Sequence, residues 1–288
     1  MKKENKGILL IILASILWGN TGTTQAFMVG NYSPLAVGTI RMIIGGATLT
    51  LYAFATGSFK KSNAPKSYAA WILTIISVTL YQPFFFSAVN LTGVGLGTIV
   101  GIGSAPIFSG IIETLRGNKL TKSWYLSTSF SIVGCIFLFA DGENVNLDIR
   151  GLFFALGAGL SYAMYVMSSS KLLTNHKREK VNAIVFGCSA LLLTPILFFV
   201  DLSFLSQSVN ILALFHLGVA TTAVAYSLFA MGLKDVAVSK AVTLTLTEPL
   251  TAAILSVAIL REPVTANIII GTSLVFIGLY INTKEKTS

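Results

Sequence analysis

Long apolar stretches recur along the chain, and short polar segments separate them. A bilayer core of roughly 30 Å needs about 20 apolar helical residues to cross it. Ten stretches come close to that length, and the connections between them are too short for a soluble domain. The predicted spans are residues 7–29, 34–56, 68–89, 92–115, 124–140, 151–170, 181–200, 211–231, 236–260 and 264–282. The pattern therefore predicts an all-α, polytopic membrane protein of ten transmembrane helices.

The first apolar stretch follows Lys2, Lys3 and Lys6, as the apolar region of a signal peptide would. It continues to about residue 29, which is too long for a signal peptide, and no small-residue cleavage site closes it. We therefore expect a retained first helix.

Charge is scarce and unevenly distributed. Charged residues make up 11% of the chain, against about a quarter in soluble domains, and the net charge is +9. With the N-terminus placed inside, seventeen basic residues fall inside: Lys2, Lys3, Lys6, Lys60, Lys61, Lys66, Arg116, Lys119, Lys122, Lys171, Lys177, Arg178, Lys180, Lys234, Lys240, Lys284 and Lys286. Two, Arg150 and Arg261, fall outside. This asymmetry predicts that both termini are cytoplasmic.

The same asymmetry explains the basic charge as a topology signal, so nucleic acid is not an expected partner. The expected partners are the lipid bilayer and a small-molecule substrate; a monomer and a homodimer both stay open. Cys135 and Cys188 lie within apolar spans and form no CxxC pair, so we expect free thiols. No metal and no cofactor are expected.

Corresponding residues recur at an offset of 144 or 143. The pairs are Gly7 and Gly151, Trp18 and Tyr162, Gly134 and Gly278, and Pro106 and Pro249, the last pair being predicted helix kinks. Each half contains five spans, an odd number, so two similar halves must cross the membrane in opposite directions. The sequence thus predicts two inverted five-helix repeats, residues 1–145 and 146–288. Many secondary transporters have this architecture, with a site between the repeats near the bilayer midplane.

Three segments carry a resemblance to a known family: SILWGNTGTTQA at residues 15–26, SPLAVGTIRMIIGG at 33–46 and LTEPLTAAILSVAILREPVT at 246–265. They resemble the EamA-type branch of the drug/metabolite transporter superfamily, and the resemblance covers essentially the whole chain. It implies two inverted repeats and movement of small metabolites, often amino acids or related compounds, across a bacterial inner membrane. Most such proteins are exporters. The segment TLRGNKLT at 114–121 departs from the Leu-Gly-Glu-like turn that the family usually has there.

Glu248 is the main candidate site residue. Lys240 is expected near the inner surface and Arg261 near the outer one, which places Glu248 about 12 Å from the first and about 20 Å from the second. A charge near the midplane costs roughly 3 kcal/mol and by default indicates function. Pro249 frees a carbonyl near Thr245 and loosens the helix at the same level. We predict that Glu248 binds substrate and could carry a proton; the alternative is a protonated acid hydrogen-bonded to a neighbouring helix.

Three further polar residues are candidates. Arg41, in the outer part of the second span, keeps its charge; it could bind a substrate carboxylate, pair with Glu248 as a gate, or brace the fold. Glu113 and His216 could carry protons. For Glu113 the alternative is an interfacial pair with Arg116, and for His216 a hydrogen-bonded interfacial histidine.

Aromatic residues complete the predicted binding site. Trp18 and Tyr162 correspond between the repeats, and Tyr81 and Tyr226 also lie within spans. Their rings could line a cavity and hold a cation or an apolar group. The alternative for each is packing or a place in the interfacial belt.

The class predicted from these residues is a secondary active transporter. No P-loop indicates direct use of ATP, and no HExxH, GxSxG or paired midplane carboxylates indicate an enzyme. A carboxylate and a guanidinium together suit a zwitterion such as an amino acid, moved by alternating access and possibly coupled to protons. A channel for small solutes and an exporter of cationic drugs or amines stay open as alternatives.

Overall fold

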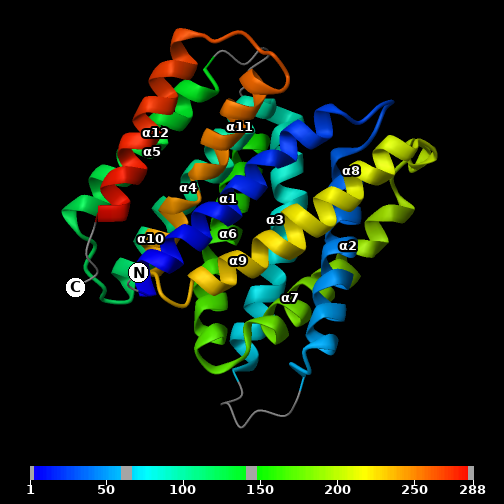
Figure 1. Ribbon diagram of the computed structural model, residues 1–288, viewed down its shortest axis with the longest axis horizontal. Coiled ribbons are helices and arrows are strands. Elements are labelled where there is room, and N and C mark those ends of the chain that lie inside the picture. Colours follow the sequence, from blue (N-terminus) through cyan, green and yellow to red (C-terminus); the bar gives the residue numbers. More distant parts are fainter. Residues whose placement is uncertain (1–2, 60–66, 141–147, 285–288) are drawn as a thin grey trace.

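The computed structural model describes residues 3–59, 67–140 and 148–284, and all regular elements in these ranges are helical (Figure 1). The helices are α1 (Lys3–Ala26), α2 (Pro34–Ala55), α3 (Tyr68–Thr92), α4 (Val94–Leu115), α5 (Lys122–Leu138), α6 (Ile149–Asn175), α7 (Arg178–Leu193), α8 (Ser208–Gly218), α9 (Ala225–Gly232), α10 (Val238–Leu244), α11 (Thr247–Ala258) and α12 (Ala266–Lys284). Short 3₁₀ helices cover Thr194–Phe198 and Ser203–Ser206. Lys2, Lys60, Lys61, Lys66, Lys286 and the predicted boundary at 145/146 lie outside the described residues.

These helices confirm the predicted spans. Nine helical stretches of the described chain are long and apolar enough to cross a bilayer, three of them made of more than one element. α5 is shorter, with 17 residues, and packs along α12 (Figure 1). A single residue, Gly93 with φ 86°, separates α3 from α4, and this left-handed conformation favours glycine.

Polar caps set several helix beginnings. Ser33 caps α2 ahead of Pro34, and Thr121 accepts from the Trp124 N–H to begin α5. Asp148 caps α6 by accepting from the Arg150 N–H at 2.9 Å, so this helix begins two residues earlier than predicted. The Arg150 side chain also binds Asp148 and lowers the pKa of that carboxyl to about 2.

Two spans of the second repeat are interrupted near the middle of the bundle. Residues Val219–Val224, between α8 and α9, form a π-helical segment. The ninth span breaks at Thr245 and Leu246, between α10 and α11. Pro249 has no N–H to donate to the Thr245 carbonyl, which accepts from the Glu248 N–H instead. α4, by contrast, is helical through Pro106.

The helix contacts repeat when the two halves are exchanged. α3 packs on α6. Its equivalent in the second repeat is the eighth span, whose second half is α9, and α9 packs on α1, the equivalent of α6. α4 packs on α6 as the equivalent α11 packs on α1. The equivalent helices α2 and α7 pack on each other, as do α5 and α12. A two-fold axis between the repeats requires this pattern.

The α5–α12 contact shows that the repeats are inverted. A methyl group on Gly134 would lie 2.7 Å from the Val275 nitrogen, and one on Gly278 would lie 2.9 Å from the Ser131 nitrogen. Both pairs, 134 with 278 and 131 with 275, keep the offset of 144. Because the later residue of α5 meets the earlier residue of α12, the two equivalent helices are antiparallel. The small residues allow this close approach, as in many membrane helix pairs.

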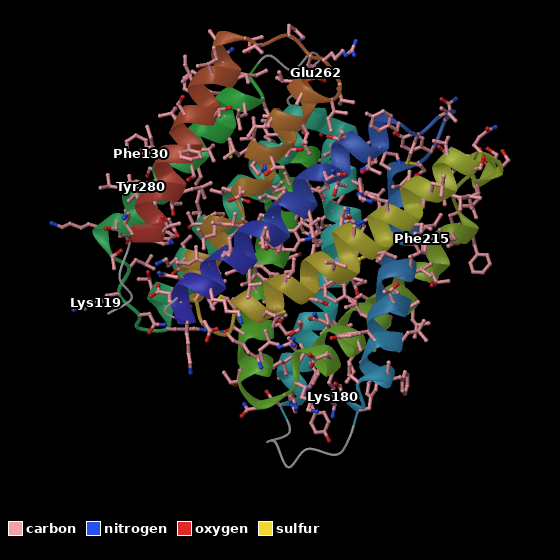
Figure 2. All side chains as sticks on the ribbon, viewed as in Figure 1. Lys119, Phe130, Lys180, Phe215, Glu262 and Tyr280 are labelled. Atoms are coloured by element: carbon pink, nitrogen blue, oxygen red, sulfur yellow. The ribbon has the colours of Figure 1, made fainter. Side chains whose placement is uncertain are left out.

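Basic residues concentrate at one end of the bundle. α1 begins and α12 ends at this end (Figure 1), and Figure 2 labels Lys119 and Lys180 along the same margin, whereas Glu262 lies at the opposite end. We call these the basic end and the opposite end. Lys240 lies in the first turn of α10 and is 2% exposed, so this basic residue is buried against neighbouring helices.

Candidate functional site

A cavity of about 70 Å³ lies between the two repeats, enough for about two water molecules. All six residues predicted to bind substrate line it: Trp18, Arg41, Tyr81, Tyr162, Tyr226 and Glu248. The remaining lining residues are Thr21, Gln25, Gln82, Phe85 and Phe86. The sequence thus identified six of the eleven lining residues, although the role of these residues in binding stays a prediction.

The cavity contains one carboxylate and one guanidinium that do not pair with each other. Arg41 reaches it from α2 and is 8% exposed, while the half-buried Glu248 reaches it from the first turn of α11. Neither side chain forms a hydrogen bond or an ion pair with any of the described residues, and the Arg41 Nε is buried without a partner. The predicted Arg41–Glu248 gate and the hydrogen-bonded glutamic acid are therefore not the arrangements observed. Two charges of opposite sign face one space that a dipolar ligand could fill.

Aromatic rings form a layer beneath the cavity. The Trp18 ring lies 4.8 Å from that of Tyr226 and edge-on to that of Tyr162 at 6.3 Å. Tyr81 extends the layer, 6.0 Å from Tyr162, and Phe186 packs 4.3 Å from Tyr226 on the side away from the cavity. Edge-on and tilted pairs of this kind add about 1 kcal/mol each beyond the area they bury. α1 begins at the basic end, and Trp18 precedes the lining residues Thr21 and Gln25 along it, so this ring lies on the basic side of those two residues.

The repeat explains which features are duplicated and which are unique. Trp18 and Tyr162 are equivalent, and both line the cavity. The position equivalent to Arg41 is Val185, and the position equivalent to Glu248, at the offset of the two prolines, is Ala105. Each charged group therefore has an uncharged residue at the equivalent position of the other repeat. The duplicated fold forms without a charge at that position, so the two charges are not needed for the fold itself.

Gln82 is a lining residue that the sequence analysis missed. It is 3% exposed, lies in α3 directly before Pro83, and occupies the position equivalent to Tyr226. Gln82-Pro83 and Glu248-Pro249 are both polar residues followed by proline within an apolar span. This shared signal could have identified Gln82.

Glu113 and His216 lie away from the cavity. Glu113 faces the basic end, where it accepts from the Asn118 side chain at 2.7 Å, and the alternative pair with Arg116 is not among the ion pairs of the described chain. His216 is exposed on α8, with Nε2 3.2 Å from the Asn20 Oδ1 of α1. The structure therefore gives neither residue direct access to the central cavity.

An ion pair with a buried lysine lies toward the basic end of the bundle. The Lys240 Nζ lies 2.9 Å from the Glu4 Oε1, with side-chain exposures of 2% and 27%. The pair joins the beginning of α1 to the beginning of α10. Asp148, at the position equivalent to Glu4, binds its neighbour Arg150, and no ion pair of the described residues joins it to the other repeat.

The described residues contain no group of three His, Cys, Asp or Glu side chains placed to hold a metal ion. The site is therefore built from a guanidinium, a carboxylate, amides and aromatic rings. Such groups bind and orient small polar molecules.

Comparisons with known proteins give one matching family model, several similar proteins and a similar solved structure. The family model, described as the EamA-like transporter family, matches the chain twice, over residues 5–140 and 149–284. The uncharacterized transporter YwfM of Bacillus subtilis (strain 168) is 36% identical over 294 aligned residues, which cover 99% of this chain and 98% of the relative. The uncharacterized inner membrane transporter YicL of Salmonella typhimurium is 23% identical over 282 residues, covering 96% and 94%. A solved structure described as "Crystal structure of protein" shares the fold, with a TM-score of 0.83 and 18% identity over 96% of this chain and 95% of that chain.

Proposed function

Because this chain belongs to the EamA-like transporter family, we propose that it is a secondary active transporter of a small zwitterion, such as an amino acid. It works by alternating access in a bacterial inner membrane, exports its substrate, and has both termini in the cytoplasm. The basic end of the bundle is then the cytoplasmic end, in accordance with the positive-inside rule.

The observation that carries the proposal is the unpaired Arg41 and Glu248 in one cavity. A buried charge without a partner costs several kcal/mol, so both groups favour a ligand that supplies the opposite charges. A zwitterion offers its carboxylate to Arg41 and its ammonium group to Glu248. The rings of Trp18 and Tyr162 beside Glu248 add cation–π attraction for the ammonium group.

The architecture supports alternating access. Two inverted repeats around one site can open it to either side of the membrane by exchanging the contacts that each repeat makes. The cavity extends toward Thr21 and Gln25, near the end of α1, and away from the basic end. The aromatic layer and the Glu4–Lys240 pair close the cytoplasmic side. This arrangement corresponds to a state closed toward the cytoplasm.

Glu248 supports coupling to protons. Its carboxylate has no partner among the described residues, so either a proton or the substrate can neutralise it. Exchange of the two on opposite sides of the membrane couples proton entry to substrate export. The break at Thr245–Leu246 allows α11 to move relative to α10 as Glu248 changes its charge.

The test is counterflow in proteoliposomes loaded with amino acids and, separately, with the corresponding decarboxylated amines and deaminated acids. We expect saturable exchange of a zwitterion. The rate of exchange should increase when a pH gradient drives protons in the direction opposite to substrate movement. Glu248→Gln should abolish exchange, whereas Glu262→Gln, the same substitution in the exposed turn before α12, should not.

Each alternative gives a different result. Flux that does not saturate indicates a channel, and exchange of amines that is indifferent to Arg41→Gln indicates an amine exporter. Saturable flux that ignores the pH gradient refutes the proton coupling alone. Untargeted metabolomics of cells that overproduce the wild type or Glu248→Gln would identify the exported compound.

A further inference from the structure

Gln82 has a buried amide that the fold leaves without a partner. The side chain is 3% exposed and lines the cavity, yet no hydrogen bond joins it to any of the described residues. An amide contributes two N–H donors and a carbonyl acceptor, and leaving them unpaired inside a protein is destabilising. A buried amide that faces a cavity is therefore suited to binding what enters it.

Packing against α2 places this amide beside Arg41. A Cβ atom on Gly38 would collide with the Phe86 ring and would lie 3.1 Å from the Gln82 Oε1, so the Gln82 amide packs closely against α2 at this glycine. Gly38 and Arg41 are three residues apart and share one face of α2. The amide and the guanidinium thus approach the cavity from neighbouring turns of the same wall.

The acidic group belongs to a different wall. Glu248 lies on α11, which packs on α1 through the close contact of Gly19 with the Glu248 carbonyl and with Thr251. The cavity therefore has a wall of donors on α2 and α3 and an acceptor wall on α11. A ligand with an acidic and a basic end fits in one orientation.

We infer that Gln82 is a specificity-determining residue that binds the substrate carboxylate together with Arg41. This inference rests on the proposed function. The Arg41 guanidinium attracts a substrate carboxylate by its charge. The Gln82 amide adds a hydrogen-bond donor to that carboxylate without adding a second positive charge. One substrate carboxylate then balances Arg41, and one ammonium group balances Glu248. A decarboxylated amine leaves both Arg41 and the Gln82 amide unsatisfied, and such unpaired groups reject an analogue strongly.

The experiment compares Gln82→Glu, Gln82→Met and wild type in proteoliposomes, with the exported amino acid and its decarboxylated amine as competing substrates. Methionine keeps the length of the side chain but removes the donors, and glutamate replaces them with a second carboxylate near Arg41. We expect Gln82→Met to raise the KM for the amino acid about tenfold and to leave the KM for the amine unchanged. Gln82→Glu should reverse the preference in favour of the amine. Gln207→Glu, the same change on an exposed residue that precedes α8, should leave the preference unchanged.

The outcomes separate this inference from the proposed function. If wild type exchanges no zwitterion, the proposed function fails. If wild type exchanges the zwitterion and both Gln82 variants keep the wild-type preference within about twofold, the role of Gln82 is refuted and the proposed function stands. If Gln82→Glu does not fold, the ratio of the KM for the amino acid to the KM for the amine in Gln82→Met is the deciding measurement. A role restricted to packing would change both KM values equally and leave this ratio unchanged.

Discussion

The ion pair between Glu4 and Lys240 provides the sharpest prediction about the transport cycle. The pair joins α1 to α10 toward the basic end of the bundle, which we propose is the cytoplasmic end, at a distance of 2.9 Å. Opening the cavity to the cytoplasm must separate these two helix beginnings. Glu4→Gln removes the carboxylate charge that lies beside Lys240, 2% exposed, in the closed state and should favour opening.

The size of the shift follows from the exposure of the two side chains. Removing one partner of a fully buried pair costs about 3–5 kcal/mol, and an exposed pair is worth at most about 1 kcal/mol. Lys240 is buried and Glu4 is 27% exposed, so we take about 2 kcal/mol, between these limits. At 1.36 kcal/mol for each factor of ten, the population open to the cytoplasm should rise about 30-fold.

The assay is the labelling rate of a cysteine that only the open state exposes. Ser15, fully buried in α1 between Glu4 and Trp18, is replaced by cysteine in a chain whose Cys135 and Cys188 are alanine. With a small thiol reagent, Glu4→Gln should label about 30-fold faster than its parent, because labelling follows the open population.

Two controls exclude a general loosening of the fold. Lys6→Gln removes an exposed charge from the same end of α1 and should leave the rate unchanged. Glu4→Lys combined with Lys240→Glu reverses the pair and should restore slow labelling. A labelling rate in Glu4→Gln within twofold of the parent would refute the role of this pair in closing the cytoplasmic side.

Two further predictions concern stability. Gly134→Ala and Gly278→Ala should each lower the free energy of unfolding by about 1–3 kcal/mol, because each added methyl group enters a contact under 3 Å. The two-fold relation between the positions predicts similar losses of melting temperature in detergent. A large loss in one variant with none in the other contradicts that relation. Asp148→Asn should lower the melting temperature at pH 7. Because Arg150 lowers the folded pKa of Asp148 to about 2 from 3.8, the stability from this cap is present above pH 4 and lost as the pH falls toward 2. The difference between wild type and variant should therefore disappear near pH 2, and a constant difference would exclude the carboxylate as its source.

The sequence by itself determined the membrane architecture. Lipid imposes a length and an apolar composition on each span and a charge bias on the loops, and these constraints act locally along the chain. The glycines at 134 and 278 indicated the duplication, and an odd number of spans made the repeats inverted. The Glu-Pro step at 248–249 indicated a midplane charge beside a weakened helix, and the span breaks one turn earlier, at Thr245–Leu246.

Only the tertiary structure decided which side chains share a space. Arg41 and Glu248 are far apart in sequence, and the rotation of α2 and α11 places them in one cavity without pairing. The same packing brings Gln82 to that cavity, leaves His216 exposed and buries Lys240 against Glu4. The apolar composition of a helix determines that it spans the membrane, but close packing against neighbouring helices determines its rotation about its own axis. Small residues such as Gly38 allow this packing, and the side chains that they contact come from other helices and are adjacent only in the folded bundle.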